Sequence, residues 1–140
     1  MIGLDTNVLL RWLIAPDEGD IGSNKSEMEL VSEIIRSADS EFFVNPIVIA
    51  ETTWILEQKL KLGRHVVCEV VDRLLYSVNI AVGDAEAVRG AREVYEAANI
   101  GFADCLIGRM NMQSGCSCTL TFDKKTGRSV GYRNISDERR

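Results

Sequence analysis

The sequence predicts an α/β protein, a three-layer α/β/α sandwich around a mainly parallel sheet of four to five strands. Short apolar, strand-like runs alternate along the chain with longer segments whose apolar residues recur at helical spacing. The chain has 140 residues, of which 46% are hydrophobic and 26% charged, enough to bury one substantial core. Because no internal repeat or linker interrupts this pattern, we expect a single domain over residues 1–140.

Each expected element follows from apolar spacing and from capping residues. Asn45 followed by Pro46 is a strong helix start, because Asn accepts hydrogen bonds from free amides and Pro is preset for the first turn. The expected strands are 1–4, 42–44, 78–82, 119–122 and a short fifth at 132–135. The expected helices are one capped by Thr6 or Asn7 and running through Leu13, then 26–37, 46–60, 66–76, 87–98 and 102–112.

In three of these helices the spacing assigns one face to the core. In the helix 66–76 that face consists of Val67, Val70, Val71, Leu74 and Leu75. In the helix 46–60, Ile47, Glu51, Trp54 and Ile55 recur at intervals of three and four, so Glu51 is expected to face inward among apolar neighbours. In the helix 26–37 the expected core stripe is Leu30, Val31, Ile34 and Ile35.

Four carboxylates interrupt apolar segments: Asp5, Glu51, Asp104 and Asp123. An ionised carboxylate away from water costs several kcal/mol unless it is paired or bound to a cation. The sequence offers no obvious basic partner near any of them, which favours a divalent ion. Asp5 and Asp123 each follow a strand and are expected at one edge of the sheet, and Asp104 is expected in a first helical turn.

Clustered carboxylates point to phosphate-ester chemistry. Hard oxygen ligands favour Mg²⁺ or Mn²⁺, which retain several waters and often complete their coordination with substrate phosphate. A bound water becomes easier to deprotonate, and the positive charge stabilises the attacking and leaving oxygens. The expected reaction is therefore hydrolysis of a phosphodiester by in-line attack.

Four pieces of the sequence, in order, resemble the PIN-domain ribonucleases and are most similar to the VapC-type toxins of toxin–antitoxin pairs. They are Asp5-Thr6-Asn7, Glu51, Phe102-Ala103-Asp104 and Thr121-Phe122-Asp123. The resemblance implies that Asp5, Glu51, Asp104 and Asp123 bind Mg²⁺ or Mn²⁺ and carry catalysis, and that Thr6, Asn7 or Thr121 orient these ligands. It also implies endoribonuclease activity, a cognate antitoxin and a homodimer. A polar insertion around Pro16 to Ser26 departs from the family pattern.

Charge is spread unevenly along the chain, whose net charge is −5. Residues 1–57 carry eleven acids against three bases, whereas residues 123–140 carry three acids against six bases. Lys124, Lys125 and Arg128 are the candidate RNA-binding residues, because a basic rim beside a metal-loaded acid cluster can hold phosphate. The alternative is that this basic end is only a solvated surface.

Other functional classes remain open from the sequence. A receiver domain needs a paired acid near its first strand and a phosphoacceptor at its third, whereas here Asp84 is better explained as a helix cap. A haloacid-dehalogenase-type phosphatase needs Asp-x-Asp after its first strand, and position 7 is Asn. A catalytically silent PIN-like module that binds RNA or protein is the non-enzyme alternative.

We expect a cytoplasmic location, because no apolar run approaches the length of a membrane span and the apolar N-terminal stretch has no basic leader. The four cysteines are then expected to be reduced, and their spacing does not match a zinc finger. Trp12, Leu13, Leu56 and Leu60 are expected to contribute to a groove for an antitoxin segment.

Overall fold

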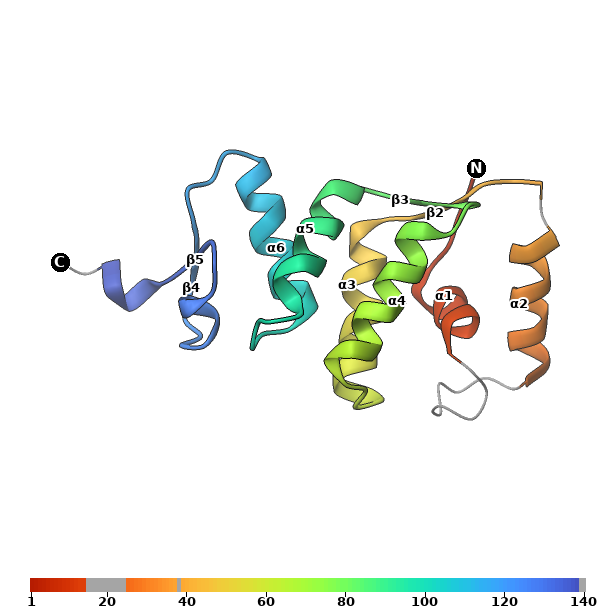
Figure 1. Cartoon of the computed structure of the whole chain (residues 1–140), viewed down its shortest axis with the longest axis horizontal. Helices are drawn as coiled ribbons and strands as arrows, with labels where there is room; N and C mark the ends of the chain where they lie inside the picture. The colour runs from red at the N-terminus through yellow and green to blue at the C-terminus, as the bar shows by residue number, and fades with distance from the viewer. Residues whose placement is uncertain (15–24, 38, 139–140) are drawn as a thin grey trace. The chain divides into compact units, whose positions relative to one another are not determined.

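The computed structural model describes residues 1–14, 25–37 and 39–138 (Figure 1). The chain forms two compact units, Met1–Asp84 and Ala85–Arg140, which we call unit 1 and unit 2. Most of the polar insertion noted in the sequence, residues 15–24, lies outside the described residues. No helix in the described part of the chain is long and apolar enough to cross a membrane.

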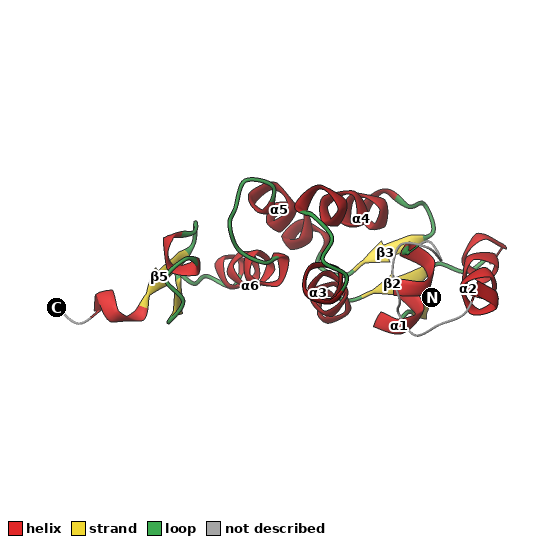
Figure 2. Cartoon of the chain, turned by 90° about the horizontal axis from the view of Figure 1, so that it is seen from below, coloured by secondary structure: helices red, strands yellow, loops and turns green. Residues whose placement is uncertain are grey.

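Unit 1 contains a parallel sheet of three strands, β1 (Ile2–Gly3), β2 (Phe42–Val44) and β3 (Ile80–Val82), in that order (Figure 2). Phe42 is in register with Ile2 on one side and with Ile80 on the other. Phe42 and Val44 are fully buried, as expected for alternate residues of a central strand that face the same core. The carboxyl ends of all three strands therefore meet at one edge of this sheet.

Four α-helices lie between these strands in the chain: α1 (Thr6–Leu13) and α2 (Lys25–Ser37) after β1, and α3 (Pro46–Trp54) and α4 (Arg64–Tyr76) after β2. A π-helical segment, η1 (Ile55–Lys59), continues α3. Figure 1 shows α1, α3 and α4 below the three strands. Leu9, Ile49 and Val71 of these helices are completely buried, so the core of unit 1 lies between the sheet and these three helices.

The predicted core face of α3 is wrong. Ile47 is 71% exposed and Trp54 is 50% exposed, and Glu51 lies on the same exposed face. The buried residues are instead Val48, Ile49, Thr52 and Thr53. Because α3 is apolar on nearly all sides, its spacing supported more than one face, and tertiary packing selected the face that carries the threonines.

The predicted core stripe of α2 is also only partly correct. Ile35 is buried, but Leu30 and Ile34 are 57% and 49% exposed, and Met28 takes the second core position. Arg11 of α1 pairs with Glu27 of α2, so a polar contact as well as apolar packing fixes which side of α2 faces α1.

Unit 2 begins with α5 (Ala85–Tyr95) and α6 (Phe102–Gln113), which pack against each other. The rings of Tyr95 and Phe102 meet edge to face with centroids 5.4 Å apart, and both side chains are buried. The remainder consists of β4 (Thr119–Thr121), the 3₁₀ turn η2 (Thr126–Arg128), β5 (Tyr132–Asn134) and the 3₁₀ turn η3 (Ile135–Glu138). β4 and β5 form a parallel pair.

The predicted α/β class, with parallel pairing of its strands, is confirmed, and the short fifth strand is present. The strands differ from the prediction in their grouping, because the described residues form a sheet of three strands in unit 1 and a pair in unit 2. Sequence periodicity finds strands but carries little information about which strands pair, since pairing depends on contacts between distant segments.

Candidate active site

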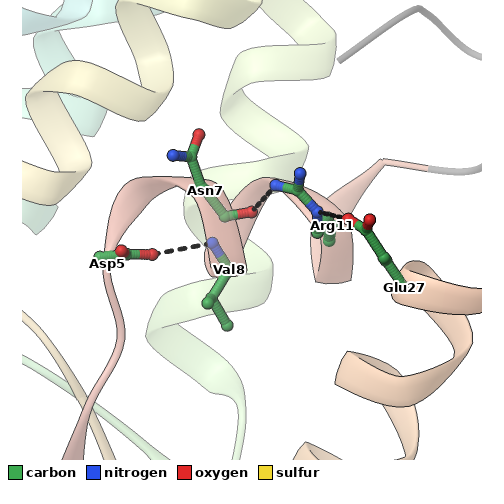
Figure 3. A network of polar contacts seen from close by, with 5 residues as sticks. All are labelled: Asp5, Asn7, Val8, Arg11 and Glu27. Carbon is green, nitrogen blue, oxygen red and sulfur yellow. Dashed lines mark hydrogen bonds and ion pairs between the residues drawn. The ribbon is translucent and has the colours of Figure 1, made fainter. Parts of the chain in front are cut away.

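Asp5 caps the N-terminus of α1 immediately after β1. Its backbone is extended, and its Oδ1 accepts a 2.9 Å hydrogen bond from the amide of Val8 (Figure 3). Asp is among the best capping residues because its carboxylate accepts from the free amides of the first turn and its charge suits the positive end of the helix. The carboxylate is exposed, so it can also reach a ligand in solvent.

Glu51 is brought to the same place by α3. The hydroxyl of Thr6, the residue after Asp5, donates a 2.9 Å hydrogen bond to Oε1 of Glu51. Thr6 is half-buried, whereas Glu51 is exposed. The hydrogen bond therefore places Glu51 beside Thr6, which follows Asp5 in the chain and to which the family resemblance assigned ligand orientation.

The base nearest to this pair in sequence is already engaged by other groups. Nε of Arg11 binds Oε2 of Glu27 at 2.9 Å, and Nη1 donates to the backbone carbonyl of Asn7 at 2.8 Å. Figure 3 shows this chain of contacts running from Asn7 through Arg11 to Glu27, while Asp5 binds the Val8 amide. Arg11 therefore neutralises Glu27 and leaves the Asp5 carboxylate available to a cation.

Asp104 lies in the first turn of α6, as predicted. It is half-buried, and its backbone carbonyl accepts a 2.7 Å hydrogen bond from the hydroxyl of Tyr132. Burial, and then the negative charge of Asp104, raise the pKa of Tyr132 to about 12. The Tyr132 ring packs against Gly108, where an added Cβ would lie only 2.9 Å from Cε2. β5 thus holds the beginning of α6 in place.

Asp123 follows β4 after one residue and holds the turn η2. Its Oδ1 accepts from the amide of Thr126 at 2.8 Å, and its own amide donates to Oγ1 of Thr121. The hydrogen bonds from Thr126, first from its amide and then from its hydroxyl, keep the pKa of Asp123 below its usual value. Asp123 is exposed and ionised at neutral pH.

The four predicted acids are thus placed two in each unit, Asp5 and Glu51 in unit 1, Asp104 and Asp123 in unit 2. No group of three or more His, Cys, Asp or Glu side chains is assembled for a metal ion among the described residues. β1 and β4 belong to different sheets, so no single sheet carries both Asp5 and Asp123 at its edge. The four-acid centre stays a prediction.

The second group of predicted site residues is placed as follows. Asn7 is exposed and contacts Arg11 through its backbone carbonyl, and Thr121 accepts from the Asp123 amide. Lys124, Lys125 and Arg128 are all exposed next to Asp123. Lys125 also helps to lower the pKa of Asp123. A basic cluster beside one of the acids is therefore present.

A family model described as the PIN domain matches residues 2–129 of the chain. The chain belongs to the PIN-domain family. This match spans all four acids and most of both units. No curated protein resembles the chain closely enough to be counted as a match. PIN domains are generally metal-dependent nucleases, so membership supports a nuclease role for this chain and the use of a divalent metal.

The donor set of this PIN domain fits a hard divalent cation. Asp5 and Glu51 offer carboxylate oxygens, each with one oxygen already oriented by a hydrogen bond from the protein. Exposed carboxylates held in this way are suitable ligands for Mg²⁺, which keeps part of its water shell.

Sequence reasoning missed two features of this PIN domain. Tyr132 was assigned only to a strand, and its contact with the Asp104 carbonyl spans 28 positions, which no local signal reveals. Phe122 was assigned to the strand before Asp123 but is 84% exposed.

The predicted antitoxin groove is wrong in part, because Leu13 and Leu56 are buried in unit 1.

Proposed function

We propose that this PIN domain is a Mg²⁺- or Mn²⁺-dependent endoribonuclease that hydrolyses RNA phosphodiester bonds. The observation that carries the proposal is the hydrogen bond from Thr6 to Glu51 beside the Asp5 cap. This hydrogen bond holds Glu51 against Thr6, the residue next to Asp5, across 45 positions of the chain. The family resemblance assigns both acids to the metal. The family resemblance also assigns Asp104 and Asp123, which belong to unit 2, to the metal.

Each residue has a defined task in this proposal. Asp5 and Glu51 hold the cation, and Thr6 keeps the Glu51 carboxylate in one orientation. When bound, the ion supplies a water of lowered pKa and positive charge for the phosphate oxygens. Lys124, Lys125 and Arg128 neutralise the phosphates that flank the scissile bond, which offsets the repulsion between RNA and a chain of net charge −5.

We further propose that the chain acts as the toxin of a toxin–antitoxin pair, as a cytoplasmic homodimer with a cognate antitoxin. The order and spacing of Asp5-Thr6-Asn7, Glu51, Asp104 and Asp123 support this through their similarity to VapC-type toxins. The exposed apolar residues of α3, Ile47 and Trp54, provide a surface for a protein partner in place of the buried Leu13 and Leu56.

The test is cleavage of total cellular RNA by the purified chain with Mg²⁺, with Mn²⁺ and with EDTA, followed by mapping of the cut ends. We expect internal cuts with either metal and none after chelation. Cleavage that persists after complete chelation would contradict the proposed metal dependence. Co-expression with the protein encoded by the adjacent gene tests the toxin role, because an antitoxin is expected to form a complex and to relieve growth inhibition.

The second candidate is a catalytically silent PIN-like module. The observation that favours it is that Lys124, Lys125 and Arg128 are exposed, which supports RNA binding whether or not cleavage follows. It predicts RNA binding without cleavage under every metal condition. A receiver domain would instead take up phosphate from a small phosphodonor and leave RNA intact.

A further inference from the structure

Unit 2 contains a pocket of about 500 Å³ that none of the four acids lines. One side is the C-terminal end of α5 with the residues that follow it, and the other is the end of η2 with Lys125 before it and the two residues after it. This volume lies within the range of small-molecule sites. The pocket is therefore large enough for a single nucleotide.

Charged and apolar groups both line this pocket. Lys125 and Arg128 provide two positive charges against one negative charge from Glu93, so the lining is positive although the chain as a whole is acidic. Lys125 and Arg128 are both exposed, so each can reach an anion in solvent, and Lys125 also interacts with the Asp123 carboxylate. Val94, Ala97 and Val130 add apolar surface, and Val130 is 75% exposed.

The backbone ties the two cations to Asp123. The Thr126 amide donates to the Asp123 carboxylate, and the Gly127 amide donates to the Asp123 carbonyl at 2.9 Å. The Arg128 amide donates in turn to the Lys125 carbonyl at 3.1 Å. An anion held by Lys125 and Arg128 therefore lies within one short turn of a proposed metal ligand.

We propose that this pocket binds one nucleotide of the RNA strand, with its phosphate at Lys125 and Arg128 and its base against Val94, Ala97 and Val130. This inference rests on the proposed nuclease function and specifies where a nucleotide near the scissile bond is held. A phosphate needs cations, and the flat face of a base gains by covering apolar side chains. Glu93 offers an acceptor for an N–H group on the edge of the base.

The experiment measures binding without cleavage, using the full chain, a short fluorescent single-stranded RNA and excess EDTA. Lys125→Ala and Arg128→Ala are each expected to raise Kd by roughly three- to tenfold, which corresponds to the loss of one phosphate contact. Arg89→Ala is the matched control, because Arg89 is an exposed base of the same unit that does not line the pocket. We expect a smaller increase in Kd for this variant.

Ala97→Phe tests the apolar part of the proposal without changing charge. Ala97 is exposed, so the larger side chain fills the pocket from its rim and is tolerated by the fold. We expect weaker RNA binding with an unchanged dependence on salt, whereas Lys125→Ala and Arg128→Ala flatten the salt dependence by about 0.7 of a log–log unit each. A nucleoside monophosphate is expected to compete better than inorganic phosphate, because only the former carries a base.

Three results would overturn the proposal. Equal effects of Arg89→Ala and Lys125→Ala would show that only the general surface charge matters. Normal RNA binding by Ala97→Phe would show that the pocket is not used. If a polyglutamate peptide competes as well as unlabelled RNA does, the pocket binds an acidic protein partner instead. Cleavage assays test the nuclease proposal separately from the pocket. If neither the wild type nor any variant cleaves RNA, the nuclease proposal alone is contradicted.

Discussion

Oγ1 of Thr6 and Oε1 of Glu51 lie 2.9 Å apart, although the two residues are 45 positions apart in the chain. This hydrogen bond joins the first turn of α1 to the exposed face of α3. The donor, Thr6, directly follows Asp5, which caps α1, so the start of this helix sets the position of the Thr6 hydroxyl. The orientation of Glu51, a proposed metal ligand on α3, therefore depends on the capping of α1.

Thr6→Val is expected to lower cleavage by about ten- to a hundredfold, the usual range for groups that orient metal ligands. Valine keeps the shape of threonine but cannot donate to Glu51. Thr6→Ser restores the hydroxyl and is expected to recover most of the activity. The measurement is kcat/KM together with the affinity for Mn²⁺, and full activity in Thr6→Val would contradict the assigned role.

Asp5→Asn and Asp5→Ala are expected to abolish cleavage alike but to differ in stability. Asparagine caps helices about as well as aspartate, so its side chain still accepts from the Val8 amide. Alanine cannot, and it is expected to cost about 1 kcal/mol in the free energy of unfolding. Denaturant unfolding measures the difference. Equal destabilisation by both variants would show that the charge, rather than the cap, stabilises α1.

Arg11→Ala is expected to reduce stability by about 0.2–1 kcal/mol and to leave cleavage near the level of the wild type. The Arg11–Glu27 pair is partly exposed, with side chains 19% and 49% accessible, and such pairs contribute little. Glu27→Gln is the matched control, since it removes the same pair from the other side. A large loss of cleavage in Arg11→Ala alone would place the guanidinium among the groups that bind RNA.

Stability is expected to fall between about pH 10 and about pH 12 because of Tyr132. Its pKa is raised to about 12 in the folded chain from 10.0, so the neutral phenol is favoured by folding. The stabilisation is complete below pH 10, the value for the unfolded chain, and is lost as pH rises through the folded pKa. Tyr132→Phe removes this dependence and also the hydrogen bond to Asp104. Unfolding curves for the wild type and Tyr132→Phe at about pH 9 and about pH 11 give the loss of unfolding free energy between these pH values. An equal loss in the two proteins would refute the prediction.

Local signals predicted much of the secondary structure. Asn45 and Pro46 define the start of α3, where the Asn45 side chain accepts from the Val48 amide as expected. The position of Asp104 in a first turn also followed from the sequence. Such features depend on neighbours within four residues, so the sequence carries them directly.

Features that depend on distant contacts were harder to predict. The face of α3 was misassigned because Ile47 and Trp54 are as apolar as Val48 and Ile49, and only packing selects between them. The π-helical segment that continues α3 was predicted as ordinary α-helix. Its i→i−5 hydrogen bond, from the Leu60 amide to the Ile55 carbonyl, does not change the spacing of apolar residues in the sequence. The ligand-orienting role of Thr6 stays a prediction, and its hydrogen-bond partner Glu51 became clear only from the structure.

The cap on α1 provides a built-in reporter of metal occupancy. The Val8 amide donates to Oδ1 of Asp5, and the same carboxylate is a proposed metal ligand. A cation that reorients the carboxylate changes how well this amide is shielded from solvent. The rate of hydrogen–deuterium exchange at Val8 therefore follows the state of Asp5, even in a variant that cuts no RNA. A single backbone proton thus records ligand binding independently of turnover.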